Sequence, residues 1–486
     1  MTVKSFPIAN KAIYRIFTFF VIFYLFCLSI PVKAQENLSL KKAIQLALQN
    51  NVQIKVAALN ESLDEVDLTQ ARNNTLPNLY ANNQTFGYYG RSIDPSTNLF
   101  VNANILGVNQ ALASQIVLYQ GGLLRKQILE GKLLLEADKS NVAKIKNEVI
   151  LSVVTTYLQV MANKDLLKAA KQQVSSITQS LERLQKNIEI GYNKALDLTP
   201  LKAQFAAAEL NQIKAQNQLD MSVLTIKQLM EMDSQKTVTF EMPDSSGMKG
   251  IKILYDPLDV YKNALEVNPD VRLAVSRQQL AYQNITIAKS SYYPSIMLFA
   301  GLNSNYSSVF QQVVGQSTST LPIGYLSGNP GQLVLAPYTQ PIYGKYPFLS
   351  QLKDNLNEAI GFNIHIPIFS RFANNSAIKK SRINYQIAGY NAQLAKDNLN
   401  KIVTQAILDL QAADKKYAGS KLTYQASKNT YDIAQERFRL GSINPLEYNT
   451  AFINLNKSEF EMIEARYELI FKSKLIDYYL GNPLDF

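Results

Sequence analysis

Two short stretches decide the fold: GYNKALD at residues 191–197 and GSINPLE at residues 441–447. They lie 250 positions apart, and the same distance separates VLYQGG (residues 117–122) from PIFSRF (residues 367–372). Chance likeness between unrelated helices does not keep a constant offset. The sequence therefore predicts that the chain contains one structural unit twice.

A second, smaller offset relates the earlier parts of the two units. ALQNNVQI (residues 47–54) matches ALEVNPDV (residues 264–271), and Pro77 matches Pro294 at the same spacing. The change from the smaller to the larger offset places one insertion between Pro294 and Pro367. We interpret the chain as a first structural repeat (35–232), an equatorial linker segment (233–256) and a second structural repeat (257–486).

Each repeat predicts the same succession of helices, with two strands between the second and the third. Pro77 and Pro294 should end the second helix, because proline pushes the residue before it into extended geometry. Gly191 and Gly441 should end the third helix as left-handed caps. The expected helices are 38–50, 52–75, 121–190 and 195–232 in the first repeat, and 257–267, 270–291, 371–440 and 445–480 in the second.

The last helix of each repeat has apolar residues every seven positions, a spacing that favours left-handed coiled-coil packing. A helix of about 70 residues is roughly 105 Å long at about 1.5 Å per residue. We therefore expect an elongated molecule in which each long helix lies beside two shorter ones. The seven-residue rows are Leu198, Phe205, Gln212, Leu219 and Ile226 in the first repeat, and Tyr448, Leu455, Met462, Leu469 and Ile476 in the second.

Residues 1–34 have the pattern of a signal peptide. Lys4, Lys11 and Arg15 precede the apolar stretch IFTFFVIFYLFCL, and Ala34 supplies a small residue for cleavage. A retained membrane anchor is the alternative, although the apolar stretch is shorter than the roughly 20 residues that a span needs. A lipoprotein acylated at Cys27 fits poorly, because bulky residues precede that cysteine.

Charge and cysteine content narrow the function classes. Removal of the signal peptide takes away the one cysteine and four basic residues but no acidic one, so the formal net charge falls from +11 to +7. The remaining charges are scattered along helices, which favours a solvated surface over nucleic-acid binding. The mature chain has no second long apolar run, so it can span a membrane only with strands in a closed barrel.

Four segments have the composition of strands: 79–90, 109–119, 296–307 and 359–369. In the last of them Ile364, Ile366 and Ile368 alternate with Asn363 and His365. Such alternation is typical of a membrane barrel wall, and a half-buried soluble sheet shows it as well.

Four strands cannot close a membrane barrel, and open edges do not occur in lipid. Several chains must therefore share one barrel if these strands span a membrane. Residues 308–357 are rich in Gly, Pro, Ser and Thr and join two strands that must pair. We expect them to form an extracellular loop, with a disordered linker as the alternative.

These features together resemble the TolC family of outer-membrane efflux proteins. The resemblance rests on the signal peptide, the two repeats, the strand entry at Pro77, the LYQGG helix entry and the turns at Gly191 and Gly441, and it covers essentially all of the mature chain. It implies a mainly α fold with a small membrane β-barrel part. Three chains would form a twelve-stranded barrel in the outer membrane of a Gram-negative bacterium, on a tunnel twelve helices wide in the periplasm.

The resemblance also implies the partners and the mechanism. The expected partners are two further copies of the chain, outer-membrane lipid, a periplasmic adaptor protein and an inner-membrane transporter of the RND or ABC class. No cofactor and no nucleic acid are expected. Small molecules or polypeptides would leave through an open duct without any chemistry.

A periplasmic gate at the turns of Gly191 and Gly441 is a further implication. In the family, acidic residues just after these turns narrow the entrance, and Asp197 and Glu447 occupy matching positions. Threefold repetition would turn them into acidic rings that favour cationic solutes. An acidic residue at a helix start also simply complements the helix dipole, so both interpretations stay open.

Other residues near the turns complete the candidate site. Thr450 departs from the family pattern, which has a second acidic residue there, and this argues against a double acidic constriction. Arg437 and Arg439 are candidates for latching the closed gate to Asp197 or Glu447. The strand-to-helix transitions are expected at Pro77, Pro294, Pro367, Gly121 and Gly122.

Nothing in the sequence predicts an enzyme. No nucleophile elbow, phosphate loop or metal-spaced cluster is present, and His365 is the one histidine. We expect His365 to be a polar residue that faces the lumen. The alternative to an export duct is a soluble periplasmic coiled-coil scaffold or adhesin.

Overall fold

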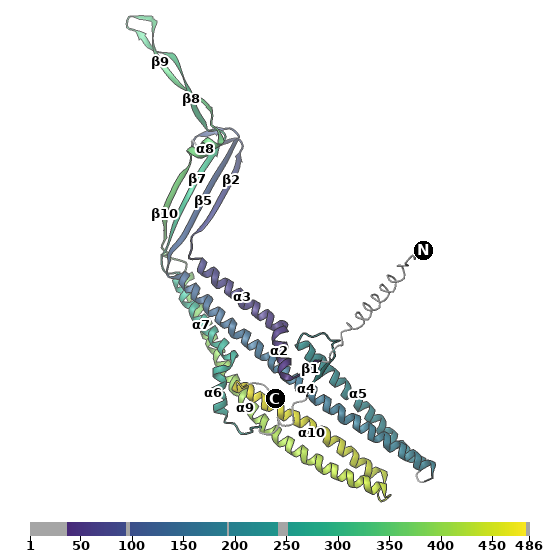
Figure 1. Cartoon of the computed structure of the whole chain (residues 1–486). Helices are drawn as coiled ribbons and strands as arrows, with labels where there is room; N and C mark the ends of the chain where they lie inside the picture. Colours follow the sequence, from purple (N-terminus) through teal and green to yellow (C-terminus); the bar gives the residue numbers. More distant parts are fainter. Residues whose placement is uncertain (1–35, 94–97, 192–193, 242–250, 483–486) are drawn as a thin grey trace, which may run out of the picture. The chain divides into compact units, whose positions relative to one another are not determined.

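The computed structural model describes residues 36–93, 98–191, 194–241 and 251–482. The predicted signal peptide and part of the predicted linker lie outside these residues. The chain divides into two compact units, and each takes segments from both halves of the sequence (Figure 1). One unit contains residues up to Lys55, Ile145–Val267 and the chain from Asn400 onward; the other contains Val56–Lys144 and Asn268–Leu399.

A four-stranded antiparallel sheet defines the second unit, with the strand order β10-β7-β5-β2. Each strand continues into or follows a helix: α3 leads into β2, β5 into α4, α7 into β7 and β10 into α9 (Figure 1). The bounds are α3 Val52–Asn73, β2 Asn78–Tyr88, β5 Ile105–Gln120, α7 Pro269–Ser290, β7 Ser295–Ser307 and β10 Asn357–His365, with the short hairpin β3 Arg91–Ile93 and β4 Phe100–Asn102 between β2 and β5.

Side chains alternate along each strand, so one face of the sheet is mainly apolar and the other is mixed and carries most of the amides. On the apolar face, Phe362 pairs with Leu298, which pairs with Ile116; the adjacent row contains Ile360 and Ala300. The opposite face carries rows of amides, namely Asn357, Asn303 and Asn82 in one row and Asn305, Asn109 and Gln84 in the next. Glu358 is the only Asp, Glu, Lys or Arg residue in these four strands.

The strand predicted at 359–369 ends earlier, at His365. Ile366 and Ile368 therefore do not continue the alternation, since Pro367 has no N–H to donate and restricts the residue before it. His365 pairs with Ser295 on the neighbouring strand.

The segment 308–357, predicted as a loop, contains a long β-hairpin and a short helix. β8 (Gln311–Leu326) pairs with β9 (Asn329–Lys345), and Gly328 in the connecting turn has a positive φ. The buried amide of Gln351 in α8 (Phe348–Asp354) fixes the base of this hairpin by bonds to both backbone groups of Ser307. β-Branched residues such as threonine and valine are frequent in strands, so the Gly and Pro content of this segment did not exclude a hairpin.

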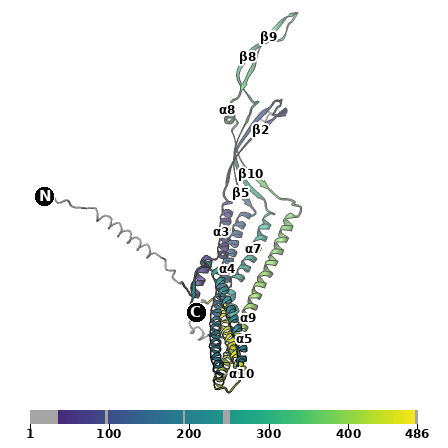
Figure 2. The ribbon, with the colours of Figure 1, turned by 90° about the vertical axis from the view of Figure 1, so that its right-hand side faces the viewer.

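The two long helices α4 (Leu123–Glu189) and α9 (Ala373–Arg439) run through both units. In both views α5 lies beside α4, and α10 lies beside α9 (Figures 1 and 2). The first unit also contains β1 Glu36–Leu38, α2 Leu40–Asn50, the 3₁₀ turn Ala195–Asp197, α5 Leu198–Leu229, β6 Val238–Phe240, α6 Pro257–Val267 and α10 Pro445–Leu480.

Element bounds recur at the two offsets found in the sequence. Residues 40–50 correspond to 257–267 and residues 52–73 to 269–290 at the smaller offset, and α4 and α9 correspond at both ends at the larger one. The second helix of each repeat is capped by the same side chain at the same place. Asn51 accepts bonds from the N–H groups of Gln53 and Ile54, and Asn268 accepts them from Asp270 and Val271.

The second helices end before the prolines that were expected to stop them. α3 ends at Asn73 and α7 at Ser290, and in each case a short turn separates the helix from Pro77 or Pro294. The proline comes directly before the strand, because its fixed φ suits the extended chain that follows. These prolines mark strand starts.

A buried tyrosine holds the small parallel sheet of β1 and β6 against α4. The hydroxyl of Tyr157 donates to the carbonyl oxygens of Leu38 (3.0 Å) and Glu241 (2.7 Å), and its ring packs edge-on against Phe240. Burial raises the pKa of Tyr157 above its usual value, with the charge of Glu241 as a second cause. The side chain is therefore a neutral structural anchor.

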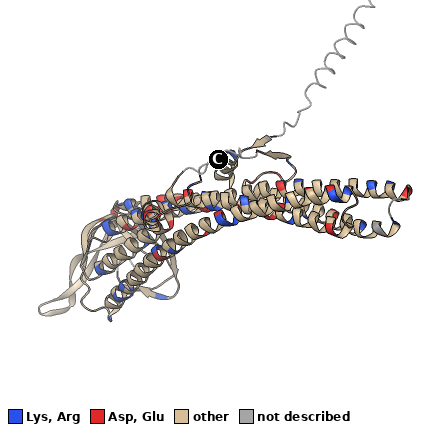
Figure 3. Cartoon of the chain, turned by 90° about the horizontal axis from the view of Figure 1, so that it is seen from below, with Lys and Arg blue, Asp and Glu red and all other residues tan. Residues whose placement is uncertain are grey.

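Charged residues of both signs are distributed along the helices (Figure 3). None of the helices in the described ranges combines the length and the apolar character that a membrane span requires.

Candidate functional site

The turns at Gly191 and Gly441 both lie in the first unit, each at the end of a helix hairpin. Their φ angles are 80° and 69°, and each N–H donates over 3.0 Å, to Ile188 and to Phe438 respectively. A Cβ added at either glycine would meet open space. Glycine is needed here only for the left-handed backbone that ends a long helix.

Left-handed residues recur at four matching pairs of positions, all separated by the larger of the two offsets. Three of these residues are not glycine, although such residues adopt this conformation at a cost. The turn from strand to long helix thus keeps its backbone geometry where the second repeat replaces two glycines with arginine and phenylalanine. The pairs are Gly121 and Arg371, Gly122 and Phe372, Gly191 and Gly441, and Glu231 and Gly481.

Glu447 takes part in a reciprocal cap at the start of α10. Its N–H donates to Asn444 Oδ1, and Asn444 Nδ2 donates to its Oε1, both over 2.9 Å. The first bond is an N-cap that satisfies a backbone donor left free at the helix start, and the second joins the two side chains. Glu447 is exposed, so the cap does not bury its carboxylate.

Asp197 ends the 3₁₀ turn before α5, and its side chain lies outside the described part of the structure. Its role at the gate stays a prediction. Thr450, one turn beyond Glu447, donates its hydroxyl to the carbonyl of Leu446 (2.8 Å) in the same helix.

The two arginines before Gly441 form local contacts. Arg439 makes a double hydrogen bond to Glu436, with N–O distances of 2.6 and 3.1 Å, and the carbonyl of Arg437 accepts the N–H of Ser442. In the described residues neither arginine pairs with Glu447. A latch to the acidic residues stays a prediction.

An aromatic cluster behind the second turn is a feature that sequence reasoning missed. Phe438 on α9 stacks on Tyr448 of α10, and the hydroxyls of Tyr448 and Tyr431 lie 3.1 Å apart. Burial and that hydrogen bond raise the pKa of Tyr431 above its usual value. The signal was present, because aromatic residues stand on both sides of the Gly441 turn.

A small apolar cluster joins the two helix hairpins near their tips. Phe452 of α10 packs with Ile177 of α4 and with Leu201 and Ala208 of α5. The tips are therefore held together by apolar contacts within one chain.

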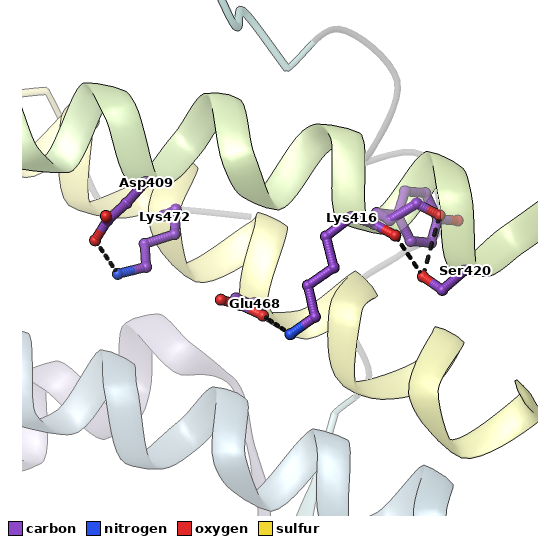
Figure 4. Close-up of polar contacts among 6 residues, drawn as sticks. Asp409, Lys416, Ser420, Glu468 and Lys472 are labelled. Carbon is purple, nitrogen blue, oxygen red and sulfur yellow. Dashed lines mark hydrogen bonds and ion pairs between the residues drawn. The ribbon is translucent and has the colours of Figure 1, made fainter. Parts of the chain in front are cut away.

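Further from the tips, ion pairs connect α9 to α10. Lys472 reaches Asp409 (2.6 Å) and Lys416 reaches Glu468 (2.7 Å), as Figure 4 shows. The bond from Lys472 holds the pKa of Asp409 below its ordinary value.

One acidic residue of α4 bridges to α10. Asp165 accepts hydrogen bonds from Arg466 and, over 2.8 Å, from the hydroxyl of Tyr467. Burial, followed by the neighbouring Asp165, raises the pKa of Tyr467.

The transition from β5 to α4 is closely packed. A Cβ at Gly121 would lie 2.8 Å from the carbonyl oxygen of Ser290 and from Cβ of Tyr293, whereas Gly122 has room. The ammonium group of Lys126 links the two elements, because it donates hydrogen bonds to Gly121 O and Ser290 Oγ. Gly121 thus allows α4 and α7 to approach each other.

No group of three or more His, Cys, Asp or Glu side chains in the described ranges is placed to hold a metal ion. The arrangement at the tips contains helix caps, apolar contacts and exposed charges.

Comparisons with known proteins agree on one family. The family model described as outer membrane efflux protein matches residues 43–230 and 350–482. TolC of Vibrio cholerae is 24% identical over 269 residues, covering 55% of this chain and 58% of that protein. Toxin and drug export protein A of Aggregatibacter actinomycetemcomitans is 21% identical over 333 residues, covering 67% and 62%. The chain thus spans about three fifths of the length of these curated relatives.

Solved structures share the fold. The Campylobacter jejuni CmeC outer membrane channel superimposes with a TM-score of 0.72 at 17% identity, over 91% of this chain and 85% of that chain. CusC gives 0.74 at 16% identity, over 91% and 92%. With the family model matching most of the sequence and the same fold in these channels, the chain belongs to the outer membrane efflux protein family.

Proposed function

We propose that the chain is the outer-membrane exit duct of an export system and that three copies build it. Each copy supplies four strands to a twelve-stranded barrel in the outer membrane of a Gram-negative bacterium. The helices continue into a tunnel, twelve helices wide, that reaches through the periplasm.

The observation that carries this proposal is the open four-stranded sheet. β2 and β10 are its edges, and apolar side chains such as Ile360, Phe362 and Ile364 are 78%, 64% and 59% exposed. A sheet of this kind is stable in lipid only when its edges are paired in a closed barrel. One chain has too few strands to close, so neighbouring copies must supply the partners.

The two faces of the sheet fit this arrangement. The apolar rows would face lipid and the amide rows would line the lumen, as in barrels that conduct water-soluble solutes. A lumen lined by Asn303, Asn305 and Asn109 offers hydrogen bonds without a fixed charge. The barrel would then be a permissive duct, and selection of cargo would belong to the pump below it.

The relatives support the partners and the direction of transport. Similar proteins in Pseudomonas putida are named as outer membrane proteins of antibiotic and toluene efflux pumps. By analogy this chain works with a periplasmic adaptor and with an inner-membrane transporter of the RND or ABC class. It exports small molecules or polypeptides by conduction, with the Gly191 and Gly441 turns as the periplasmic entrance.

Membrane fractionation followed by planar-bilayer recording tests this function. Detergent extracts of the outer membrane should contain the protein as a particle with the mass of three chains. That particle should conduct ions in single steps when added to a lipid bilayer. Recovery of a soluble monomer without conductance would instead favour a periplasmic scaffold or adhesin.

A further inference from the structure

Glu358, the only Asp, Glu, Lys or Arg residue of the four-stranded sheet, lies on the mainly apolar face of that sheet. It pairs with Leu302, which pairs with Leu112. Ile360, two residues further along β10, lies on the same face and is 78% exposed. In the proposed barrel this face lies against lipid, where a lone carboxylate is destabilising unless it is near the membrane surface or has a cationic partner.

Glu358 stands at the end of the apolar rows that is further from the helices. Ile364 and Glu358 are six residues apart on β10, which is about 20 Å at roughly 3.3 Å per residue. The next row of this face, toward β8, is polar: Ser304 pairs with Gln110, and Gln110 pairs with Asn83. The carboxylate therefore lies where the apolar band ends, which is the level of the lipid headgroups in the proposed barrel.

A shallow hollow of about 480 Å³ lies beside Glu358 on this face. The row that crosses it has two small residues in its middle, because Ala300 of β7 pairs with Ser114 of β5. Larger apolar side chains border these two residues, namely Leu79, Leu112, Leu302 and Ile360. A hollow of this kind accepts a hydrocarbon chain, and the adjacent carboxylate accepts hydrogen bonds.

The sheet itself offers no Lys or Arg to pair with Glu358. β2, the strand that a neighbouring copy would place beside β10, has the uncharged sequence NLYANNQTFGY. Arg91, the first cationic residue after β2, holds its guanidinium over the ring of Phe100 at 5.2 Å. Within the described part of the chain the carboxylate of Glu358 has no hydrogen-bond or ion-pair partner. Its partner must therefore come from outside the sheet.

Helix α8 lies on the same face of the sheet, at the same end. The hydroxyl of Ser304 donates to the carbonyl of Leu352 over 2.6 Å, and the ring of Tyr306 packs edge-on against Phe348. Both β7 residues belong to the apolar face, because side chains alternate along the strand. α8 is thus held next to the row of Glu358.

α8 presents both a cationic and an apolar side chain. Lys353 is exposed, and in the described residues its ammonium group has no hydrogen-bond or ion-pair partner. The neighbouring Asp354 accepts a hydrogen bond from the hydroxyl of Tyr346. Leu349 is 76% exposed. This combination is typical of a helix that lies at a membrane surface.

We propose that this corner of the sheet binds a phospholipid whose headgroup carries an ammonium group, with the chemistry of phosphatidylethanolamine. One acyl chain lies in the hollow over Ala300 and Ser114. The headgroup ammonium donates to the carboxylate of Glu358, and Lys353 pairs with the phosphate. A lipid without a cationic headgroup leaves Glu358 without a partner. The inference rests on the proposed position of the sheet in the outer membrane, and it names the lipid that the sheet selects.

Lipid titration of the detergent-extracted protein tests the site, with native mass spectrometry to count the lipids that stay bound. Phosphatidylethanolamine should bind at least about tenfold more tightly than phosphatidylglycerol with the same acyl chains, since a hydrogen bond between charged groups is worth a factor of this size. Glu358→Gln should remove this preference, and Glu358→Lys should reverse it. Lys353→Gln should weaken the binding of both lipids, because both carry a phosphate.

Arg91→Gln is the matched control, because it removes one charge near the same end of the sheet but outside the site. This variant should keep the preference for phosphatidylethanolamine. Equal affinity of the wild type for both lipids, or a preference that persists in Glu358→Gln, would overturn the inference. Loss of the preference in Arg91→Gln would overturn it as well, since Glu358 would then act through an ion pair with that arginine.

Single-channel recording in a lipid bilayer separates this inference from the proposed function. A wild-type protein that conducts but does not distinguish the two lipids would lose the lipid site and keep the duct. A protein that stays soluble and does not conduct would lose both.

Discussion

Phe438 on α9 and Tyr448 on α10 stack almost face to face across the Gly441 turn, with ring centroids 4.8 Å apart and planes inclined by 14°. The contact ties α9 to α10 next to the turn that joins them. In the first repeat the corresponding positions are Ile188 and Leu198. The second hairpin therefore has an aromatic lock where the first has aliphatic residues.

Removing the ring of Tyr448 should loosen this hairpin. Tyr448→Ala should lose the aromatic pair, which contributes about 0.5–1.5 kcal/mol beyond the buried area. Limited proteolysis at the Gly441 turn should become faster, and the open probability of single channels should rise. Tyr448→Phe keeps the stacked ring and removes only the bond to Tyr431, so it should behave almost like the wild type. Equal effects of both variants would contradict a role for stacking.

The tip glycines should resist replacement for a backbone reason alone. Gly191→Ala and Gly441→Ala should each lower the free energy of unfolding by about 1 kcal/mol, because alanine tolerates positive φ poorly. Gly419 is the matched control, since it lies inside α9 with open space around its missing Cβ. Gly419→Ala should stabilise the helix by about 0.5–1 kcal/mol. Denaturant unfolding that shows the same sign at all three positions would be inconsistent with a backbone origin.

The acidic residues after the turns should act on ion flow through their charge. Asp197→Ala combined with Glu447→Ala should raise single-channel conductance and weaken the preference for cations, if the two form charged rings at the entrance. Glu447→Ala alone also removes the side-chain bond from Asn444 Nδ2, although the N-cap bond to the backbone N–H of residue 447 remains. Glu447→Gln keeps an oxygen that accepts from Asn444 Nδ2 and removes only the charge. Unchanged conductance and ion preference in Asp197→Asn with Glu447→Gln would remove the gating role.

The ion pair between Asp409 and Lys472 should give the protein an acid-sensitive clamp. Its bond to Lys472 holds the pKa of Asp409 below the usual value, so the stabilisation is present above about pH 4 and is lost as pH falls through the lowered pKa. Asp409→Asn should therefore melt at a lower temperature than the wild type at pH 7. The difference should shrink in melting curves taken below about pH 4.

Asp414→Asn provides the comparison for this acid effect, since Asp414 lies on the same helix and has no ion pair within the described residues. Its melting temperature should follow that of the wild type over the same pH range. A deficit of Asp409→Asn that stays constant down to pH 3 would mean that the carboxylate charge is not what stabilises the contact.

Much of the fold was predictable because the repeat fixes it twice. Helix propensity and the absence of proline defined the long helices to within a few residues, and Gly191 and Gly441 marked their ends. The strands alternate as expected from Ile296 to Leu302, since each side chain must choose one face. The helix ends at Asn73 and Ser290 were harder to predict from the sequence, because the turns that follow them are determined by packing against neighbouring elements.

The long hairpin was not predictable from composition. Pairing of β8 with β9 depends on contacts between residues far apart in the sequence, and its Gly and Pro content is that of a loop. The left-handed backbone at Arg371 and Phe372 could not be predicted from the sequence either, because only the surrounding structure can hold such residues in that conformation. At the candidate site the turn glycines were visible in the sequence, whereas the aromatic lock required a structure that shows which side chains contact each other.

Electron microscopy of the detergent-extracted protein tests the proposed assembly most directly. We expect top views of a hollow ring with threefold symmetry, in which each copy joins its neighbours through β2 and β10. A solid particle with the volume of one chain, obtained under conditions that keep the native fold, would contradict it.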